Sequence, residues 1–118
     1  MIVNFLKDTL NKMEENGVSP DDVLYVFNSF GYCSWEEFEK LANFDYNNGY
    51  GLVAIDLNLI VRGSDWWLER GEYDGSEWWE YKQMPNIEKK PLVSVDRIIC
   101  DCGHYLAYTL KSLNEDKE

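Results

Sequence analysis

The sequence predicts an α+β fold in a single domain spanning residues 1–118, with three N-terminal helices, an antiparallel three-stranded β-meander that contains a Trp-rich hairpin, and a C-terminal helix. Three observations lead to this prediction. Apolar residues recur at helical spacing between residues 2 and 42, the pattern changes to that of strands after Asn47-Asn48-Gly49, and Asp74-Gly75 is a strong hairpin signal. A length of 118 residues is typical of one domain.

Capping residues divide the first third of the chain into three expected helices. The first ends before Gly17 and has an apolar face made of Ile2, Phe5, Leu6, Leu10 and Met13. The second begins at Ser19, an N-cap followed by a proline at the first helical position, and ends at Gly31, with an apolar face of Val23, Leu24, Phe27 and Phe30. The third begins with a capping box, Ser34 and Glu37, and continues through Phe38, Leu41 and Ala42.

Strands are expected in the middle of the chain. Leu52–Ile55 and Leu57–Val61 are rich in aliphatic and β-branched residues, and the segment DWWLERGEYDGSEWWEYK (65–82) follows. A two-residue turn at Asp74-Gly75 pairs Tyr73 with Ser76, Glu72 with Glu77, Arg70 with Trp79 and Leu68 with Tyr81. Polar residues 83–91 then form a linker before the C-terminal helix.

This register sorts the hairpin side chains into two faces, because side chains alternate along a strand. The face expected in the core carries Trp66, Leu68, Trp79 and Tyr81, with Arg70 lying over the Trp79 ring. The opposite face carries the candidate partner-binding residues Trp67, Glu69, Tyr73, Trp78 and Glu80, with the Trp78 indole covering Gly71. Folding needs only the inner pair of indoles, so the outer pair predicts an interface. The alternative is that a helix or loop covers the outer indoles, or that the acidic residues only form a solvated face.

The charge of the chain limits the classes of partner. There are 22 acidic and 11 basic residues, which gives a net charge of −11 at pH 7. Nucleic acids and anionic membranes are bound through cationic surfaces, so neither is expected as a direct ligand, whereas a basic protein surface fits. No stretch has the length and apolarity of a membrane span or of a signal peptide, and we therefore expect a cytoplasmic protein.

A possible zinc site involves all the cysteines and the single histidine of the chain. Cys33, Cys100, Cys102 and His104 make a Cys₃His set, which is typical of closed structural zinc sites. The site requires Leu92–Ile99 to be extended and the C-terminal helix to begin near Gly103; one continuous helix over Val95–Leu113 would turn Cys102 away from the other ligands. Ordinary burial of the cysteines is the alternative.

The sequence contains no nucleophile–base arrangement, phosphate loop or HExxH-type motif. The opposed carboxylates Glu69 and Glu80 are only a weak indication of glycosidase chemistry. We therefore expect a protein that is not an enzyme.

The segment DWWLERGEYDGSEWWEYKQMP resembles stretches in small proteins of phages and prophages of Gram-positive bacteria, and the size and acidity of the chain are similar to those of anti-CRISPR proteins that inhibit the type II effector nuclease. The resemblance implies an inhibitor that occupies a basic, nucleic-acid-binding surface of a host defence protein such as a CRISPR effector nuclease. The alternative is a small-ligand protein that sequesters a nucleotide signal on Trp67 and Trp78.

Overall fold

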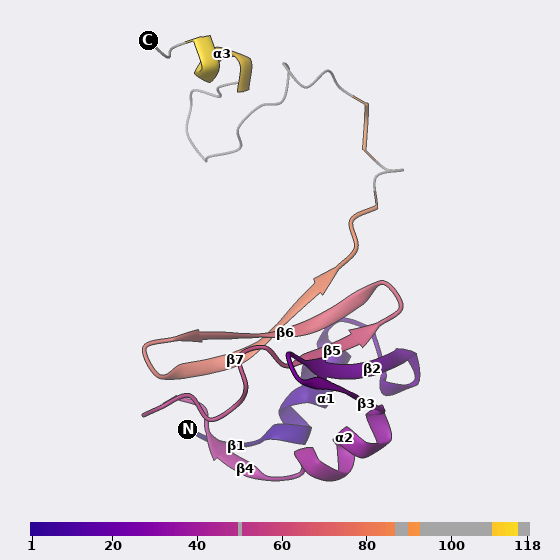
Figure 1. Ribbon diagram of the computed structural model, residues 1–118, viewed down its shortest axis with the longest axis vertical. Coiled ribbons are helices and arrows are strands. Elements are labelled where there is room, and N and C mark those ends of the chain that lie inside the picture. The colour runs from indigo at the N-terminus through magenta and orange to yellow at the C-terminus, as the bar shows by residue number, and fades with distance from the viewer. Residues whose placement is uncertain (50, 87–89, 93–109, 116–118) are drawn as a thin grey trace. The chain divides into compact units, whose positions relative to one another are not determined.

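The computed structural model describes residues 1–49, 51–86, 90–92 and 110–115. The chain divides into two units, Met1–Met84 and Pro85–Glu118 (Figure 1), and each is described by itself. In the second unit the described residues include one short helix, α3 (Leu110–Glu115). All other helices and strands of the described residues belong to the first unit. That residues 1–118 form a single domain stays a prediction.

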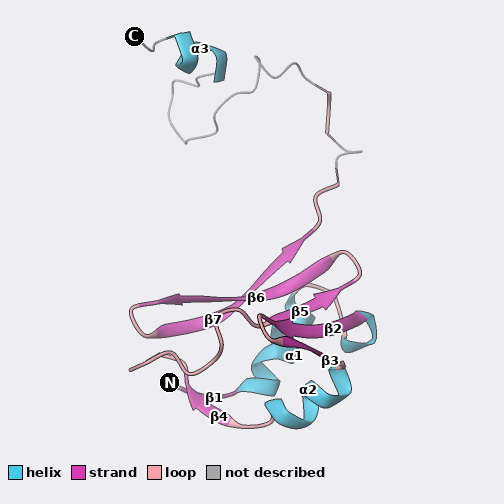
Figure 2. Cartoon of the chain, viewed as in Figure 1, coloured by secondary structure: helices cyan, strands magenta, loops and turns pink. Residues whose placement is uncertain are grey.

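The first unit contains two helices, two sheets and one 3₁₀ turn. Its elements in chain order are β1 (Ile2–Asn4), α1 (Phe5–Glu15), a 3₁₀ turn (Pro20–Asp22), β2 (Val23–Asn28), β3 (Gly31–Cys33), α2 (Trp35–Ala42), β4 (Asp45–Asn47), β5 (Ile60–Gly63), β6 (Trp66–Tyr73) and β7 (Ser76–Gln83). Five strands form an antiparallel sheet in the order β3-β2-β5-β6-β7, and β1 pairs with β4 in a second, two-stranded sheet. Both helices lie on the same side of the larger sheet (Figure 2).

The predicted arrangement of three N-terminal helices and a three-stranded meander is wrong. The chain is α+β, but its main sheet has five strands, and the expected second helix is instead the 3₁₀ turn followed by strand β2. The segment VLYVFN consists largely of β-branched and aromatic residues, which favour a strand. It then turns sharply at Asn28, whose side-chain Oδ1 accepts hydrogen bonds from the backbone N–H groups of Phe30 and Gly31. The result is a β-hairpin of β2 and β3.

The expected strand at Leu52–Ile55 is also wrong, because this segment is irregular, and only the end of Leu57–Val61 joins a strand. The predicted third helix is confirmed as α2, and the first is confirmed as α1 from Phe5 onward. Ile2, expected on the apolar face of the first helix, belongs instead to strand β1. Asn4 caps α1 by accepting from the Lys7 N–H at 3.0 Å, and Ser34 caps α2 by accepting from the Glu37 N–H at 3.2 Å.

The predicted register of the Trp-rich hairpin is confirmed for every predicted pair, from Tyr73 with Ser76 to Leu68 with Tyr81. The turn has positive φ at both central residues, 50° at Asp74 and 87° at Gly75, as a type I′ turn requires. Each Trp-Trp pair therefore places one indole on the inner face of the sheet and the other on the outer face.

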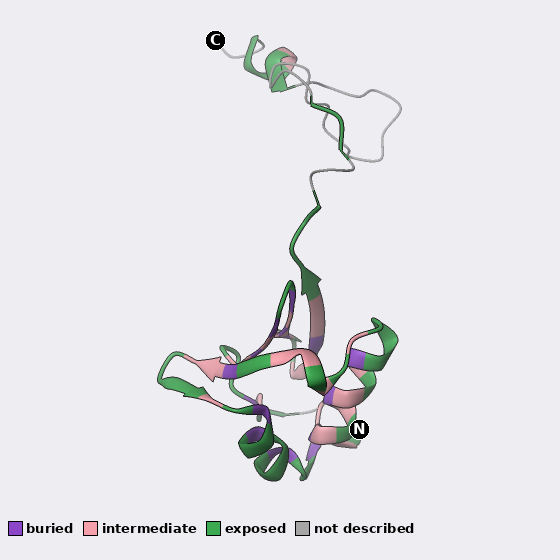
Figure 3. Ribbon diagram, turned by 90° about the vertical axis from the view of Figure 1, so that its right-hand side faces the viewer, coloured by how far each residue is buried: buried purple, intermediate pink, exposed green. Residues whose placement is uncertain are grey.

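The core lies between the helices and the inner face of the sheet (Figure 3). Trp66, Leu68 and Trp79 are at most 3% exposed. The Trp79 ring stacks on Phe5 of α1 with 5.5 Å between centroids, and its indole N–H donates to Thr9 Oγ1 at 2.8 Å. These contacts attach α1 to the hairpin and leave the other face of the sheet pointing away from the helices.

None of the helices in the described parts of the chain has both the length and the apolar character that crossing a membrane requires.

Candidate protein-interaction face

The face of the five-stranded sheet that points away from α1 and α2 is the candidate functional site, and we call it the outer face. The strand register assigns its residues, because side chains directly opposite one another lie on the same face. All five strands contribute to it: Tyr32 from β3, Tyr25 and Phe27 from β2, Ile60 and Arg62 from β5, Trp67, Glu69, Gly71 and Tyr73 from β6, and Ser76, Trp78, Glu80 and Lys82 from β7. Aromatic side chains dominate this set.

Each outer indole is held by a carboxylate two residues further along its own strand. The Trp67 Nε1–H donates to Glu69 Oε1 at 2.7 Å, and the Trp78 Nε1–H donates to Glu80 Oε1 at 3.1 Å. Lys82 Nζ lies 3.7 Å from Glu80 Oε2. Glu69 and Glu80 are directly opposed, as expected, but these contacts give each carboxylate a partner that offsets their repulsion.

The outer indoles are also positioned by neighbours from adjacent strands. The guanidinium of Arg62 lies 5.7 Å from the centre of the Trp67 ring. Gly71 is opposite Trp78, and a Cβ atom at Gly71 would lie 2.7 Å from Trp78 Nε1. The Trp78 ring therefore covers Gly71, as the sequence predicts, and only glycine leaves room for that placement.

The structure brings the five predicted partner-binding residues to one face. Trp78 is 38% exposed and Tyr73, at the end of the hairpin, is 77% exposed. Trp67, Glu69 and Glu80 are half-buried. Large side chains that are accessible and yet fixed by hydrogen bonds are typical of interface anchors, because little conformational entropy is lost when a partner binds them.

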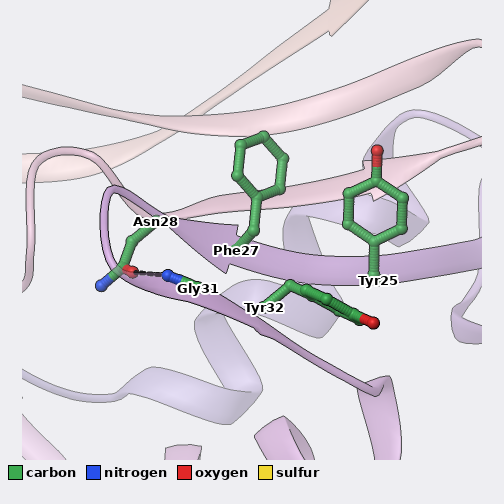
Figure 4. Close-up of a pocket in the computed structure, with 5 residues that line it drawn as sticks. All are labelled: Tyr25, Phe27, Asn28, Gly31 and Tyr32. Carbon is green, nitrogen blue, oxygen red and sulfur yellow. Dashed lines mark hydrogen bonds between the residues drawn. The ribbon is translucent and has the colours of Figure 1, made fainter.

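Sequence reasoning missed the aromatic residues of the β2–β3 hairpin, because it assigned Tyr25 and Phe27 to a helix that ends at Gly31, just before Tyr32. Tyr25, Phe27 and Tyr32 surround a hollow of about 530 Å³, whose lining Asn28 and Gly31 complete (Figure 4). A second hollow, of about 390 Å³, lies on the other side of the ridge formed by Tyr25 and Phe27. The strand-like composition of VLYVFN, followed by Asn28 at the turn, is the signal that would have identified these residues.

One acid of the hairpin belongs to the core and not to the acidic surface. Glu77 is 2% exposed and accepts hydrogen bonds from the backbone N–H groups of Ala54 and Ile55 at 2.7 and 3.0 Å. Arg70 donates to it at 3.0 Å and to the Tyr46 hydroxyl at 3.1 Å. Glu77, which pairs with Glu72 in the strand register, therefore has a structural role: it anchors the loop that contains Ala54 and Ile55.

The Arg70 guanidinium contacts two aromatic rings that stack on each other, and it lies 4.7 Å from the centre of Trp79 and 5.4 Å from that of Phe5. The predicted stacking of Arg70 on Trp79 is confirmed. Within the described residues its Nε and Nη1 atoms have no hydrogen-bond partner, so the ring contacts and Glu77 together stabilise the buried charge. On α1, burial raises the pKa of Asp8, while the positive charge of Arg70 acts in the opposite direction.

Of the predicted zinc ligands, only Cys33 lies within the described residues; Cys100, Cys102 and His104 lie outside them. Cys33 is a free thiol that packs against the core beside Val26 and Phe38. Burial, and after it the Glu37 carboxylate, raises the pKa of Cys33, which favours the thiol over the thiolate. The described residues contain no cluster of three or more metal-binding side chains, and zinc binding by the full set stays a prediction.

The negative charge is concentrated in the first unit. Residues 1–84 contain 16 acidic and 6 basic side chains, a net charge of −10 out of −11 for the chain. The outer face itself is mixed, because Arg62 and Lys82 accompany Glu69 and Glu80. The sheet thus presents aromatic anchors on a strongly acidic body.

Comparisons of the chain with protein families, with curated proteins and with solved structures found no match.

Proposed function

We propose that the chain is a non-enzymatic binding protein whose outer face occupies a basic surface of a host nucleic-acid-binding protein and blocks the loading of nucleic acid. The role that best fits this activity is that of a phage-encoded inhibitor of a defence protein such as a CRISPR effector nuclease. The observation that carries the proposal is the outer face, where Trp78 is exposed, Trp67 is half-buried, and each indole is fixed by a glutamate.

The aromatic content of the outer face supports protein binding. Interfaces between proteins are enriched in Trp and Tyr, and a few buried aromatic anchors supply most of the binding energy. Trp67 and Trp78 are set in a sheet whose opposite face is fixed to α1, so the anchors are presented on a rigid element. A rigid sheet face loses little entropy when a partner covers it.

The net charge of the first unit supports a basic partner. A charge of −10 on residues 1–84 attracts a positively charged surface over several ångströms and accelerates its association. A protein surface that binds nucleic acid carries clustered lysine and arginine. Occupation of that surface by an acidic protein would exclude the nucleic acid.

The small-ligand alternative is less well supported by the geometry. Trp78 is opposite Gly71, four residues along β6 from Trp67, which separates the two backbone positions by roughly 13 Å along the strand. Both indole N–H groups are engaged by the opposed carboxylates Glu69 and Glu80, whose negative charge would repel a phosphate placed beside the rings. The two tryptophans therefore suit an extended surface better than a single small molecule.

The proposal is tested by capturing partners from a bacterial lysate with the wild-type chain and with Trp67→Ala and Trp78→Ala. Each variant should bind the captured protein more weakly by about 2 kcal/mol or more, because each removes an aromatic anchor. Leu41→Ala is the matched control, since Leu41 is 78% exposed but belongs to α2 on the other side of the sheet.

The captured partner must bind DNA or RNA, and the chain must compete with that nucleic acid in a titration. Recovery of a bound small molecule in place of a protein, or a complex that binds nucleic acid with unchanged affinity, would contradict the proposal.

A further inference from the structure

The β2–β3 hairpin contains a second feature that the proposed anchors Trp67 and Trp78 do not use. Tyr25 and Phe27 rise side by side from β2, and Tyr32 of β3 lies beside them (Figure 4). The ring centres of Tyr25 and Phe27 are 5.5 Å apart, and those of Tyr25 and Tyr32 are 6.1 Å apart. The rings are inclined to one another by 56° and 67°, so they line the hollow as separate walls instead of closing it by stacking.

The hollow has the size and composition of a ligand site. Its volume of about 530 Å³ falls in the range of roughly 300–1,000 Å³ that is usual for such sites. Tyr32 is 81% exposed and Tyr25 is 38% exposed, so both rings are accessible from solvent. Three accessible aromatic rings around one space are an arrangement that attracts cations through their negative faces.

A carboxylate is held next to the hollow. Asn28, which lines it, donates from Nδ2 to Asp56 Oδ2 at 2.8 Å. The other carboxylate oxygen of Asp56 accepts from the Asn58 N–H at 2.9 Å, so the group is fixed in place from two sides. The negative charge of Asp56 adds to the attraction that the rings exert on a cation.

We infer that this hollow receives an arginine side chain presented by the basic partner, with the guanidinium against Tyr25, Phe27 and Tyr32. Arginine is preferred to lysine because its planar, weakly hydrated group stacks on aromatic rings, and the nearby charge of Asp56 adds a longer-range attraction. The inference rests on the proposed function for the source of the arginine. The hollow itself can be tested without any partner.

Two arginines in the described part of the chain show the same chemistry. The guanidinium of Arg70 lies against Trp79 and Phe5 on the inner face, and that of Arg62 lies over Trp67 on the outer face. Arg62 is opposite Tyr25, and it is the cation of β5 on this side of the sheet. Arg62 lines the second hollow, together with Trp67. Tyr25 and Phe27 separate this second hollow from the one proposed to receive arginine.

The test is a titration of the full chain with the peptide acetyl-Gly-Gly-Arg-Gly-Gly-amide, followed by NMR of the aromatic ring protons. A peptide with citrulline in place of arginine is the matched control, because citrulline has nearly the same shape and no charge. We expect the arginine peptide to shift the rings of Tyr25, Phe27 and Tyr32 and to bind about tenfold more tightly than the citrulline peptide.

Variants locate the site. Tyr32→Ala should abolish the difference between the two peptides, whereas Tyr32→Phe, which keeps a ring, should retain it. Tyr32 is on an edge strand and is largely exposed, so the fold survives its truncation, which an unchanged melting temperature verifies. Asp56→Asn should weaken arginine binding and leave citrulline binding unchanged. Equal binding of both peptides, no binding of either, or shifts confined to other rings would overturn the inference.

Trp78→Ala separates this inference from the proposed function. That variant should leave the binding of the arginine peptide unchanged, because Trp78 is on β7 and does not line the hollow. If partner binding depends on Trp78 and the arginine peptide fails to bind, the hollow inference alone is wrong. If the arginine peptide binds and the captured partner has no affinity for nucleic acid, the proposed function alone is wrong.

Discussion

Replacement of Glu77 by alanine should destabilise the first unit more than any other single change to a hairpin acid. The Glu77 side chain is fully buried, it forms an ion pair with Arg70, and it accepts from the backbone N–H groups of Ala54 and Ile55. Loss of one partner of a buried ion pair costs about 3–5 kcal/mol, because the other charge is left uncompensated. The two backbone donors lose their acceptor as well, so we expect a loss at the upper end of that range.

This cost is comparable to the whole stability of a small domain, about 5–15 kcal/mol, and urea denaturation followed by circular dichroism would measure it. The control is Glu72→Ala, which removes the acid directly opposite in the strand register but at an exposed position. It should change the free energy of unfolding by no more than about 0.5 kcal/mol. Similar losses for the two variants would refute the assignment of Glu77 to the core.

A double variant, Arg70→Met with Glu77→Ala, would separate the ion pair from the backbone contacts. Removal of both charges should recover part of the loss, because no uncompensated charge then remains. Recovery should be incomplete, since the N–H groups of Ala54 and Ile55 still lack the carboxylate. Full additivity of the two single changes would mean that the charges do not interact.

Three further predictions follow from individual contacts. Gly71→Ala should displace the Trp78 indole and increase its quenching by acrylamide, because the new Cβ would lie 2.7 Å from Trp78 Nε1; unchanged quenching would contradict the placement of the ring. The Trp66 indole, and after it Ser64, hold the pKa of Asp22 below its ordinary value of 3.8. The stability that the ionised Asp22 contributes is therefore present at neutral pH and is lost as the pH falls through its lowered pKa. Asp22→Asn should lower the melting temperature at pH 7, and the melting temperatures of the variant and the wild type should become equal in acid. Elemental analysis of protein prepared without chelators should find about one zinc per wild-type chain and less zinc in Cys102→Ser. Wild-type protein without zinc would contradict the zinc prediction.

The Trp-rich hairpin was predictable from the sequence because its determinants are local. Asp74-Gly75 specifies a two-residue turn, and that turn fixes the register and with it the face of every side chain from Trp66 to Tyr81. The caps of α1 and α2 are similar, since Asn4 and Ser34 act within three residues of themselves. The outward position of Trp67 and Trp78 follows from these local rules alone.

The β2–β3 hairpin was not predictable by the same reasoning. Ser19-Pro20 and the two acids after it are typical of a helix start, and they do open a helical turn, but only a 3₁₀ turn of three residues. VLYVFN forms a strand because it pairs with β5, whose residues lie 33 to 40 positions further along the chain. The role of Glu77 has the same origin, because its partners Ala54 and Ile55 belong to a loop that no hairpin pattern identifies.

The attachment of the inner indoles has a consequence for attempts to imitate this protein with a peptide. Trp79 donates to Thr9 of α1 and Trp66 donates to Asp22, so the hairpin obtains its inner contacts from segments more than 40 residues away in the chain. A synthetic hairpin of residues 65–82 would expose all four indoles to water and would associate through the pair that the intact protein conceals. Faithful mimicry of the outer face therefore requires the whole sheet with its supporting helix, and small cyclic fragments are poor starting points for a substitute.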